Sequence, residues 1–240
     1  MDDQVARLVD KAWEKFQQTP RDRRFLIAIG GIPGSGKTTL SQIVTQALNA
    51  RHAGLHSESQ DAAPIAAFVP MDGYHLTRAQ LSAMPDPATA HARRGAEFTF
   101  DGPAFLSLVR ALRAPLTAAS AAVFAPSFDH AVKDPRAGDI AVRPGHRIVV
   151  FEGNYVLLDR EPWREAAGLM DERWFADVDF SVARRRLVAR HVAAGIAGDE
   201  DEAGRRADEN DLVNGRQIVE NRTHVHEIIV SRDDEKWKHE

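Results

Sequence analysis

The sequence predicts a three-layer α/β/α fold around a mainly parallel, five-stranded sheet. Strand-like apolar runs alternate with helical patterns along the chain, which is typical of a parallel sheet with helices on both faces. Runs such as residues 25–29 and 148–151 are apolar throughout, as expected for strands covered on both faces. The chain has 240 residues, 43% of them hydrophobic, and no long linker, so one domain over residues 1–240 is expected.

The elements can be placed in order from their composition. Predicted strands are short and mostly apolar, and lie at residues 25–29, 65–69, 121–125, 147–151, 174–178 and 227–230. Predicted helices repeat apolar residues at helical spacing, and lie at residues 3–18, 40–48, 101–112, 162–170, 182–193 and 205–219. The remaining stretches indicate a surface insertion at 50–64, a mobile segment at 77–95 and a turn-rich segment at 126–145.

The first strand leads into a phosphate-binding loop. The pattern Gly31-x-x-x-x-Gly36-Lys37-Thr38 stands between a strand and a helix, which is the context that this motif requires. Glycines let backbone N–H groups face a phosphate, and the helix N-terminus adds positive potential. The sequence therefore predicts a P-loop NTPase that binds a nucleoside triphosphate through Gly31, Gly34, Ser35, Gly36, Lys37, Thr38 and Thr39, with the Thr38 hydroxyl on Mg²⁺.

Two carboxylates follow predicted strands. Asp72 comes after the strand at 65–69, and Glu152 comes directly after the strand at 147–151. Ligands of open parallel sheets lie at the carboxyl ends of the strands, so one carboxylate can accept a proton while the other binds the Mg²⁺ shell. The alternative for Asp72 is an ordinary turn residue, since Asp-Gly is a common turn pair.

Six motifs in the same order resemble the phosphoribulokinase, uridine kinase and bacterial-type pantothenate kinase superfamily of P-loop kinases. They span about residues 24–222 and read GGIPGSGKTTL, MDGYHL, RRGAEFTFDGPAF, PSFDH, VVFEGNYVLL and VARRRLVAR. Residues 209–214 resemble the pantothenate kinase branch more than uridine kinase. Short relatives described as sugar or fructose-transport kinases look more similar still.

The resemblance implies roles for the residues that match its motifs. Asp72 is expected to be the general base, Lys37 to stabilise the transferred phosphoryl group, and Thr38 with Glu152 to hold Mg²⁺. His130 matches a substrate-contacting histidine, and Tyr74 and His75 are expected to face the acceptor. Phe128 stands where pantothenate and uridine kinases usually have tyrosine, which removes one hydroxyl from the acceptor side.

A basic helix and two asparagines complete the expected site. Arg186 and Arg190 are four residues apart and share a helix face, and the resemblance makes about residues 186–210 a helical lid whose arginines close over ATP and exclude water. From the residues alone, a solvated basic face is an equal alternative. Asn210 and Asn214 also share a face, and are either substrate or adenine contacts or exposed amides near a helix start.

These observations predict an ATP- and Mg²⁺-dependent kinase that phosphorylates a hydroxyl of a small metabolite: a sugar or polyol, a nucleoside, or pantothenate. The alternative is a nucleotide-dependent switch or assembly ATPase that acts on a protein partner. A GTPase is disfavoured because no Asn precedes a Lys, and a transporter ATPase because the chain lacks a Ser-Gly-Gly-Gln signature.

The composition of the chain limits the kinds of binding partner that are expected. The net charge of −4 disfavours a nucleic-acid partner, and the absence of cysteine excludes disulfides and thiolate metal sites. No signal peptide or membrane-spanning run is seen, so no membrane partner and a cytoplasmic location are expected. The amphipathic N-terminal helix either packs on its own sheet or on a second copy, which leaves a homodimer open.

Overall fold

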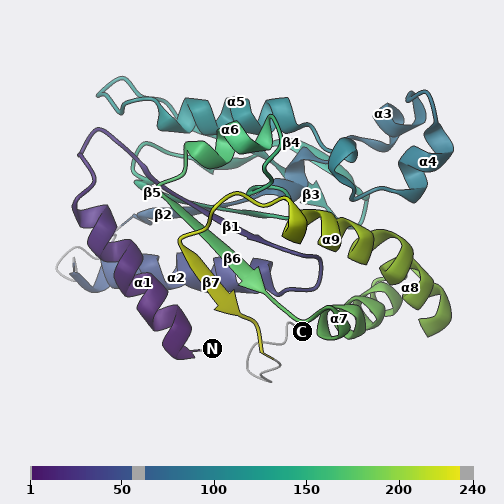
Figure 1. Ribbon diagram of the computed structural model, residues 1–240. Coiled ribbons are helices and arrows are strands. Elements are labelled where there is room, and N and C mark those ends of the chain that lie inside the picture. Colours follow the sequence, from purple (N-terminus) through teal and green to yellow (C-terminus); the bar gives the residue numbers. More distant parts are fainter. Residues whose placement is uncertain (1, 56–62, 233–240) are drawn as a thin grey trace.

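A computed structural model describes residues 2–55 and 63–232. Five strands form one sheet in the order β2-β5-β1-β6-β7, and each pairing between neighbours is parallel. The strands are β1 (Phe25–Gly31), β2 (Ala66–Pro70), β5 (Ile148–Gly153), β6 (Glu172–Asp177) and β7 (Glu227–Val230). The prediction of a mainly parallel, five-stranded α/β sheet is therefore confirmed (Figure 1).

Helices cover both faces of this sheet because successive strand residues point to opposite sides. Helices α1 (Asp2–Gln17) and α2 (Lys37–Leu55) pack on the face that presents Ile27 and Ile29 of β1. Helices α5 (Gly102–Arg113) and α6 (Trp163–Gly168) pack on the face that presents Leu26 and Ala28. Figure 1 shows these two layers on either side of the sheet.

Helix α1 is attached to the sheet by a buried carboxylate as well as by apolar contacts. Glu172 of β6 is fully buried and accepts hydrogen bonds from Lys15 and from the indole Nε1 of Trp174, and it forms an ion pair with Lys11 at 3.2 Å. Burial raises the pKa of Glu172, but these hydrogen bonds outweigh it and hold the pKa below its usual value. The N-terminal amphipathic helix therefore packs on its own sheet.

Two segments differ from the expectation. The segment at 77–95 contains α3 (Arg78–Ser82) and α4 (Pro87–Ala92), whose N-caps Thr77 and Asp86 accept hydrogen bonds from backbone N–H groups. The insertion expected from residue 50 begins later, because α2 continues to Leu55; residues 56–62 of that insertion lie outside the described residues.

The turn-rich segment at 126–145 is also more ordered than expected. Strand β3 (Val123–Asp129) pairs antiparallel with β4 (Asp134–Val142) to form a separate hairpin. Most residues of β4 are polar or small, and four of its nine residues are exposed, so the strand lacks the apolar alternation that would have identified it. Two short 3₁₀ turns, η1 (Met71–Tyr74) and η2 (Glu97–Thr99), complete this part of the chain.

The expected helical lid lies at one end of the sheet. It consists of α7 (Phe180–Ala193), α8 (Glu200–Arg206), a π-helical turn η3 (Ala207–Asp211) and α9 (Leu212–Glu220). Arg184 of α7 binds Asp208 through two hydrogen bonds of 2.8 Å, and His191 Nε2 lies 2.8 Å from Asp211 Oδ2. Among residues 2–55 and 63–232, no helix has the length and apolar character that crossing a membrane requires.

Candidate active site

Each glycine of the phosphate-binding loop meets a separate steric demand. Gly34 and Gly36 adopt φ angles of 81° and 80°, in the left-handed region that favours glycine. A Cβ atom on Gly31 would lie 2.5 Å from the Ser35 hydroxyl and 2.8 Å from the Ala176 carbonyl oxygen. The loop thus reaches its compact shape only with glycines at these positions, and Ser35 is buried inside it.

Lys37, Thr38 and Glu152 converge at the start of α2 and the end of β5. The Thr38 hydroxyl donates a hydrogen bond of 3.1 Å to Glu152 Oε1, and Lys37 Nζ lies 3.8 Å from the same oxygen. Burial lowers the pKa of Lys37, against the opposing effect of Glu152 and Asp72. Burial also raises the pKa of Glu152 to about 7, and the nearby Lys37 only partly offsets this.

The donor atoms at this point suit Mg²⁺. Thr38 and Glu152 supply hard oxygen ligands, and Asp72 lies close enough to influence the pKa of Glu152. No cluster of three or more His, Cys, Asp or Glu side chains with metal-binding geometry occurs in the described part of the chain. Mg²⁺ is commonly bound through one or two protein oxygens together with phosphates and water, and the hydroxyl of Thr38 and the carboxylate of Glu152 are oxygens of this kind.

Asp72 reaches the same region from the neighbouring strand. Pro70 of β2 lies opposite Glu152 of β5 in the parallel register, and Asp72 follows two residues later in η1. The carbonyl oxygen of Asp72 accepts hydrogen bonds from the backbone N–H and the Nδ1 of His75, at 3.1 and 2.8 Å. Gly73 fixes the position of this turn, since a Cβ there would lie 2.1 Å from the Pro126 carbonyl oxygen.

Beyond Asp72 lies a cluster of rings from three parts of the chain, in tilted and edge-on contact. The His75 ring lies 4.0 Å from Phe100 and 4.9 Å from Phe128 between centroids, and Phe128 lies 5.2 Å from His130. Burial lowers the pKa of His75, against the opposing effect of Asp72. Because Phe128 and His130 come from the β3–β4 hairpin, that hairpin forms one wall of the region beyond Asp72.

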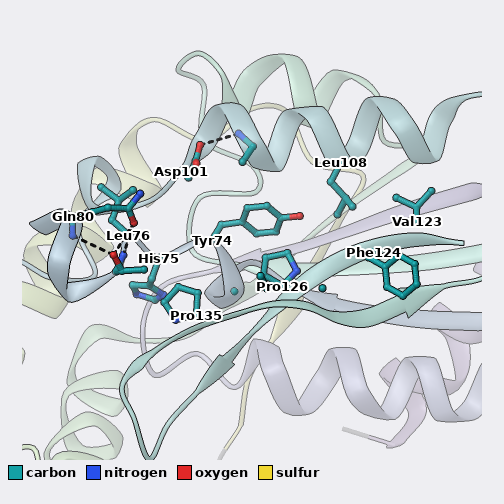
Figure 2. Close-up of a pocket in the computed structure, with 15 residues that line it drawn as sticks. Tyr74, His75, Leu76, Gln80, Asp101, Leu108, Val123, Phe124, Pro126 and Pro135 are labelled. Atoms are coloured by element: carbon teal, nitrogen blue, oxygen red, sulfur yellow. Dashed lines mark hydrogen bonds between the residues drawn. The ribbon is translucent and has the colours of Figure 1, made fainter.

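Tyr74 lies on a different side of η1. It is 5% exposed, and its ring packs edge-on against Phe105 of α5 at 5.3 Å. Figure 2 shows its hydroxyl pointing along α5 toward Leu108, inside a cavity of about 450 Å³ between α5 and the hairpin. Tyr74 therefore lines this cavity, and the expected contact between Tyr74 and an acceptor would be made inside it. His75 borders both the cavity and the ring cluster.

The two lid arginines occupy different positions. Arg186 Nη1 donates to the Gly34 carbonyl oxygen at 3.1 Å and to the Ser231 hydroxyl at 2.9 Å, which ties α7 to the phosphate-binding loop. Arg190, one helical turn further on, is exposed, and its charge influences the pKa of both Lys37 and Glu152. Arg186 therefore contacts the phosphate-binding loop, Arg190 is close enough to influence the pKa of Lys37 and Glu152, and the closing of both arginines over ATP stays a prediction.

Asn210 and Asn214 are not exposed amides. Both are buried, and their Oδ1 atoms accept hydrogen bonds of 2.9 Å from Nε and Nη2 of Arg93. Arg93 begins the Arg-Arg-Gly run at the end of the 77–95 segment, and no pattern in the sequence indicates its contact with the two asparagines. In the structure, the two asparagines bind the guanidinium of Arg93. Their contact with a substrate stays a prediction.

Several known proteins are similar to this chain in sequence or in fold. The chain is 59% identical over 159 residues to an ATP-dependent kinase-like protein of Aspergillus versicolor, covering 66% of this chain and 92% of that protein. It is 42% identical over 192 residues to a uridine kinase-like protein of Schizosaccharomyces pombe, covering 80% and 77%. A fructose transport system kinase-like structure from Silicibacter sp. TM1040 superposes with a TM-score of 0.78 at 34% identity, covering 94% and 98%. No family model matches the chain.

Proposed function

Because this chain belongs to the phosphoribulokinase and uridine kinase-like family of P-loop kinases, we propose that it transfers the γ-phosphoryl group of ATP to a hydroxyl group of a small metabolite. The observation that carries the proposal is the convergence of Lys37, Thr38 and Glu152 with Asp72 at the carboxyl ends of neighbouring strands. Parallel sheets present ligand sites at this edge, and phosphoryl transfer needs a cation, a metal site and a proton acceptor there.

On the donor side, the chain binds and orients the triphosphate. The glycine loop directs its N–H groups and the α2 N-terminus toward the phosphates, and Lys37 supplies a charge that burial keeps poorly screened. Thr38 and Glu152 would hold Mg²⁺, which would neutralise charge on the phosphate oxygens. Arg190 adds positive charge from the lid, and lid closure excludes water that would otherwise compete as acceptor.

On the acceptor side, Asp72 accepts the proton of the attacking hydroxyl. The carboxylate is half-buried, and the hydrogen bonds that its carbonyl oxygen accepts from His75 fix the turn that carries it. The tilted His75, Phe100 and Phe128 rings offer a largely apolar surface for the body of the acceptor. A sugar or polyol, a nucleoside and a pantothenate-like compound are the acceptor classes that we propose.

The test is phosphorylation of a metabolite panel by the purified protein with ATP and Mg²⁺, followed by ³¹P NMR. We expect one class of acceptor to yield a phosphorylated product, and Asp72→Asn to lower kcat about 10²- to 10⁴-fold while ATP affinity is unchanged. Full transfer activity in Asp72→Asn would exclude Asp72 as the base.

The rival function, a nucleotide-dependent switch or assembly ATPase, makes a different prediction in the same assay. Small molecules would then leave the rate of ATP consumption unchanged, and only a protein partner would raise it. A metabolite-dependent increase in ADP release that is matched by phosphorylated product therefore supports the kinase.

A further inference from the structure

Two consecutive arginines, Arg93 and Arg94, end the α4 segment and have opposite electrostatic surroundings. Arg94 donates to the carboxylate of Asp134 at 2.9 Å and to the carbonyl oxygens of Leu76 and Lys133. A carboxylate therefore compensates its charge, and Arg94 serves to join this segment to the β3–β4 hairpin. Its guanidinium also lies over the Phe128 ring, 5.6 Å from the centroid.

Arg93 is held in place without being neutralised. Its Nε and Nη2 donate to the Oδ1 atoms of Asn210 and Asn214, both at 2.9 Å, and these amides are 4% and 1% exposed. Within residues 2–55 and 63–232, Arg93 forms no ion pair. A carboxamide oxygen orients a guanidinium but carries no net charge, so Arg93 keeps its full positive charge and leaves Nη1 available.

Arg93 is linked to both the donor and the acceptor regions through its neighbours. Its partner Asn210 precedes Asp211, whose charge influences the pKa of Lys37. Asn210 Nδ2 also donates a hydrogen bond of 3.2 Å to the carbonyl oxygen of Arg94, whose guanidinium lies over the Phe128 ring of the acceptor-side cluster. The residue that holds Arg93 is therefore also bonded to the segment that contacts the acceptor-side rings.

We propose that Arg93 binds an anionic group of the acceptor, so that the acceptor is a hydroxylated molecule carrying a carboxylate or a phosphate. The inference rests on the proposed kinase function. A half-buried, pre-oriented guanidinium with neutral partners is suited to recognise a planar carboxylate or a phosphate, and a neutral acceptor would leave that charge without a partner. Asn210 and Asn214 are positioning residues that present Arg93 to this group.

The test uses matched pairs of small molecules that differ in one charge. D-glycerate is compared with glyceramide, pantothenate with panthenol, and D-ribose 5-phosphate with D-ribose, each added to protein saturated with Mg²⁺ and a non-hydrolysable ATP analogue. We expect the anionic member of at least one pair to raise the Tm of the wild type, and its neutral partner to have little effect. A response in the glycerate or pantothenate pair indicates that a carboxylate is recognised, and a response in the ribose 5-phosphate pair indicates that a phosphate is recognised.

Three variants separate anion binding from a structural role. Arg93→Gln is expected to weaken binding of the anionic ligand about ten- to a hundredfold. Asn214→Asp keeps an oxygen acceptor for Nη2 but adds a neutralising charge, so we expect a similar loss of affinity without loss of Tm. The control Arg110→Gln removes one exposed charge whose partner is Glu165, and should leave the affinity unchanged.

If Arg93 has only a structural role, Asn214→Asp should give the opposite result. The new ion pair between Arg93 and the aspartate introduced at position 214 would strengthen their contact, and the affinity for the ligand would be unchanged. The inference is overturned if Asn214→Asp binds the anionic ligand normally, or if no anionic member shifts the wild type. Phosphorylation of a neutral acceptor by ATP would overturn the inference and leave the kinase function standing. Binding of an anionic member without phosphoryl transfer would contradict the kinase function alone.

Discussion

Lys37 Nζ and Glu152 Oε1 lie 3.8 Å apart in a buried site, where the lysine begins α2 and the glutamate lies near the end of β5. The contact is long for an ion pair, and the hydroxyl of Thr38 lies closer to the same oxygen, at 3.1 Å. Neither charge is thus fully compensated by the other in a region of low polarity. A triphosphate and a divalent cation would each supply the partner that one of these groups lacks.

The raised pKa of Glu152 makes the nucleotide-free protein less stable as pH rises. Its pKa is about 7 in the folded protein against an ordinary value of 4.5, so the folded state binds more protons between these pH values. Stability from this group is therefore present below pH 4.5 and is lost as pH rises to about 7. We expect Glu152→Gln to reduce the loss of stability between pH 5 and 7.

Urea unfolding at pH 5, 6, 7 and 8 measures this effect. The control Glu165→Gln removes an exposed carboxylate that pairs with Arg110, and it should reproduce the wild-type slope. If the free energy of unfolding of Glu152→Gln declined with pH as steeply as that of the wild type over this range, the buried carboxyl of Glu152 would not be the group responsible.

The sequence predicted the donor half of the site better than the acceptor half, for a physical reason. Glu152 lies near the end of β5, Asp72 comes two residues after β2, and Lys37 comes at the end of the loop that follows β1. Parallel topology brings these strand ends to one edge whatever the detailed packing. The contact between Arg93 and Asn210 joins residues that are 117 positions apart, and no periodicity encodes it. The direction of the Tyr74 side chain could not be predicted from the sequence either, because it depends on a single 3₁₀ turn.

Gly73 is predicted to be essential for the position of Asp72. A Cβ atom there would lie 2.1 Å from the Pro126 carbonyl oxygen, so Gly73→Ala must push η1 away from β3. We expect Gly73→Ala to cost about 1–3 kcal/mol of stability from overpacking. A displacement of about 1 Å at the base would also lower kcat about 10²-fold.

Chemical unfolding and steady-state kinetics with the identified acceptor measure the two effects. Gly168→Ala is the matched control, since a Cβ at that position of α6 has no atom within 4 Å. It should leave both kcat and stability near the wild-type values. Wild-type kcat in Gly73→Ala would show that η1 tolerates the shift and that Asp72 is not held by this contact.

Arg190 is predicted to act on the transition state and not on folding. It is exposed on α7, and within the described ranges it forms no hydrogen bond or ion pair, yet its charge influences the pKa of Lys37 and Glu152. An arginine that reaches the transferring phosphoryl group stabilises negative charge that is greatest during transfer. We therefore expect Arg190→Met to lower kcat about 10²- to 10³-fold.

The same variant should leave the free energy of unfolding within about 0.5 kcal/mol of the wild type, since an exposed side chain without partners contributes little to folding. Single-turnover kinetics separates the phosphoryl-transfer step from product release, and urea unfolding measures stability. Arg184→Met on the same helix is the comparison: it breaks an exposed ion pair with Asp208 but carries no charge near Lys37. If Arg184→Met slowed transfer as much as Arg190→Met, the effect would come from loosening the lid and not from the charge at position 190.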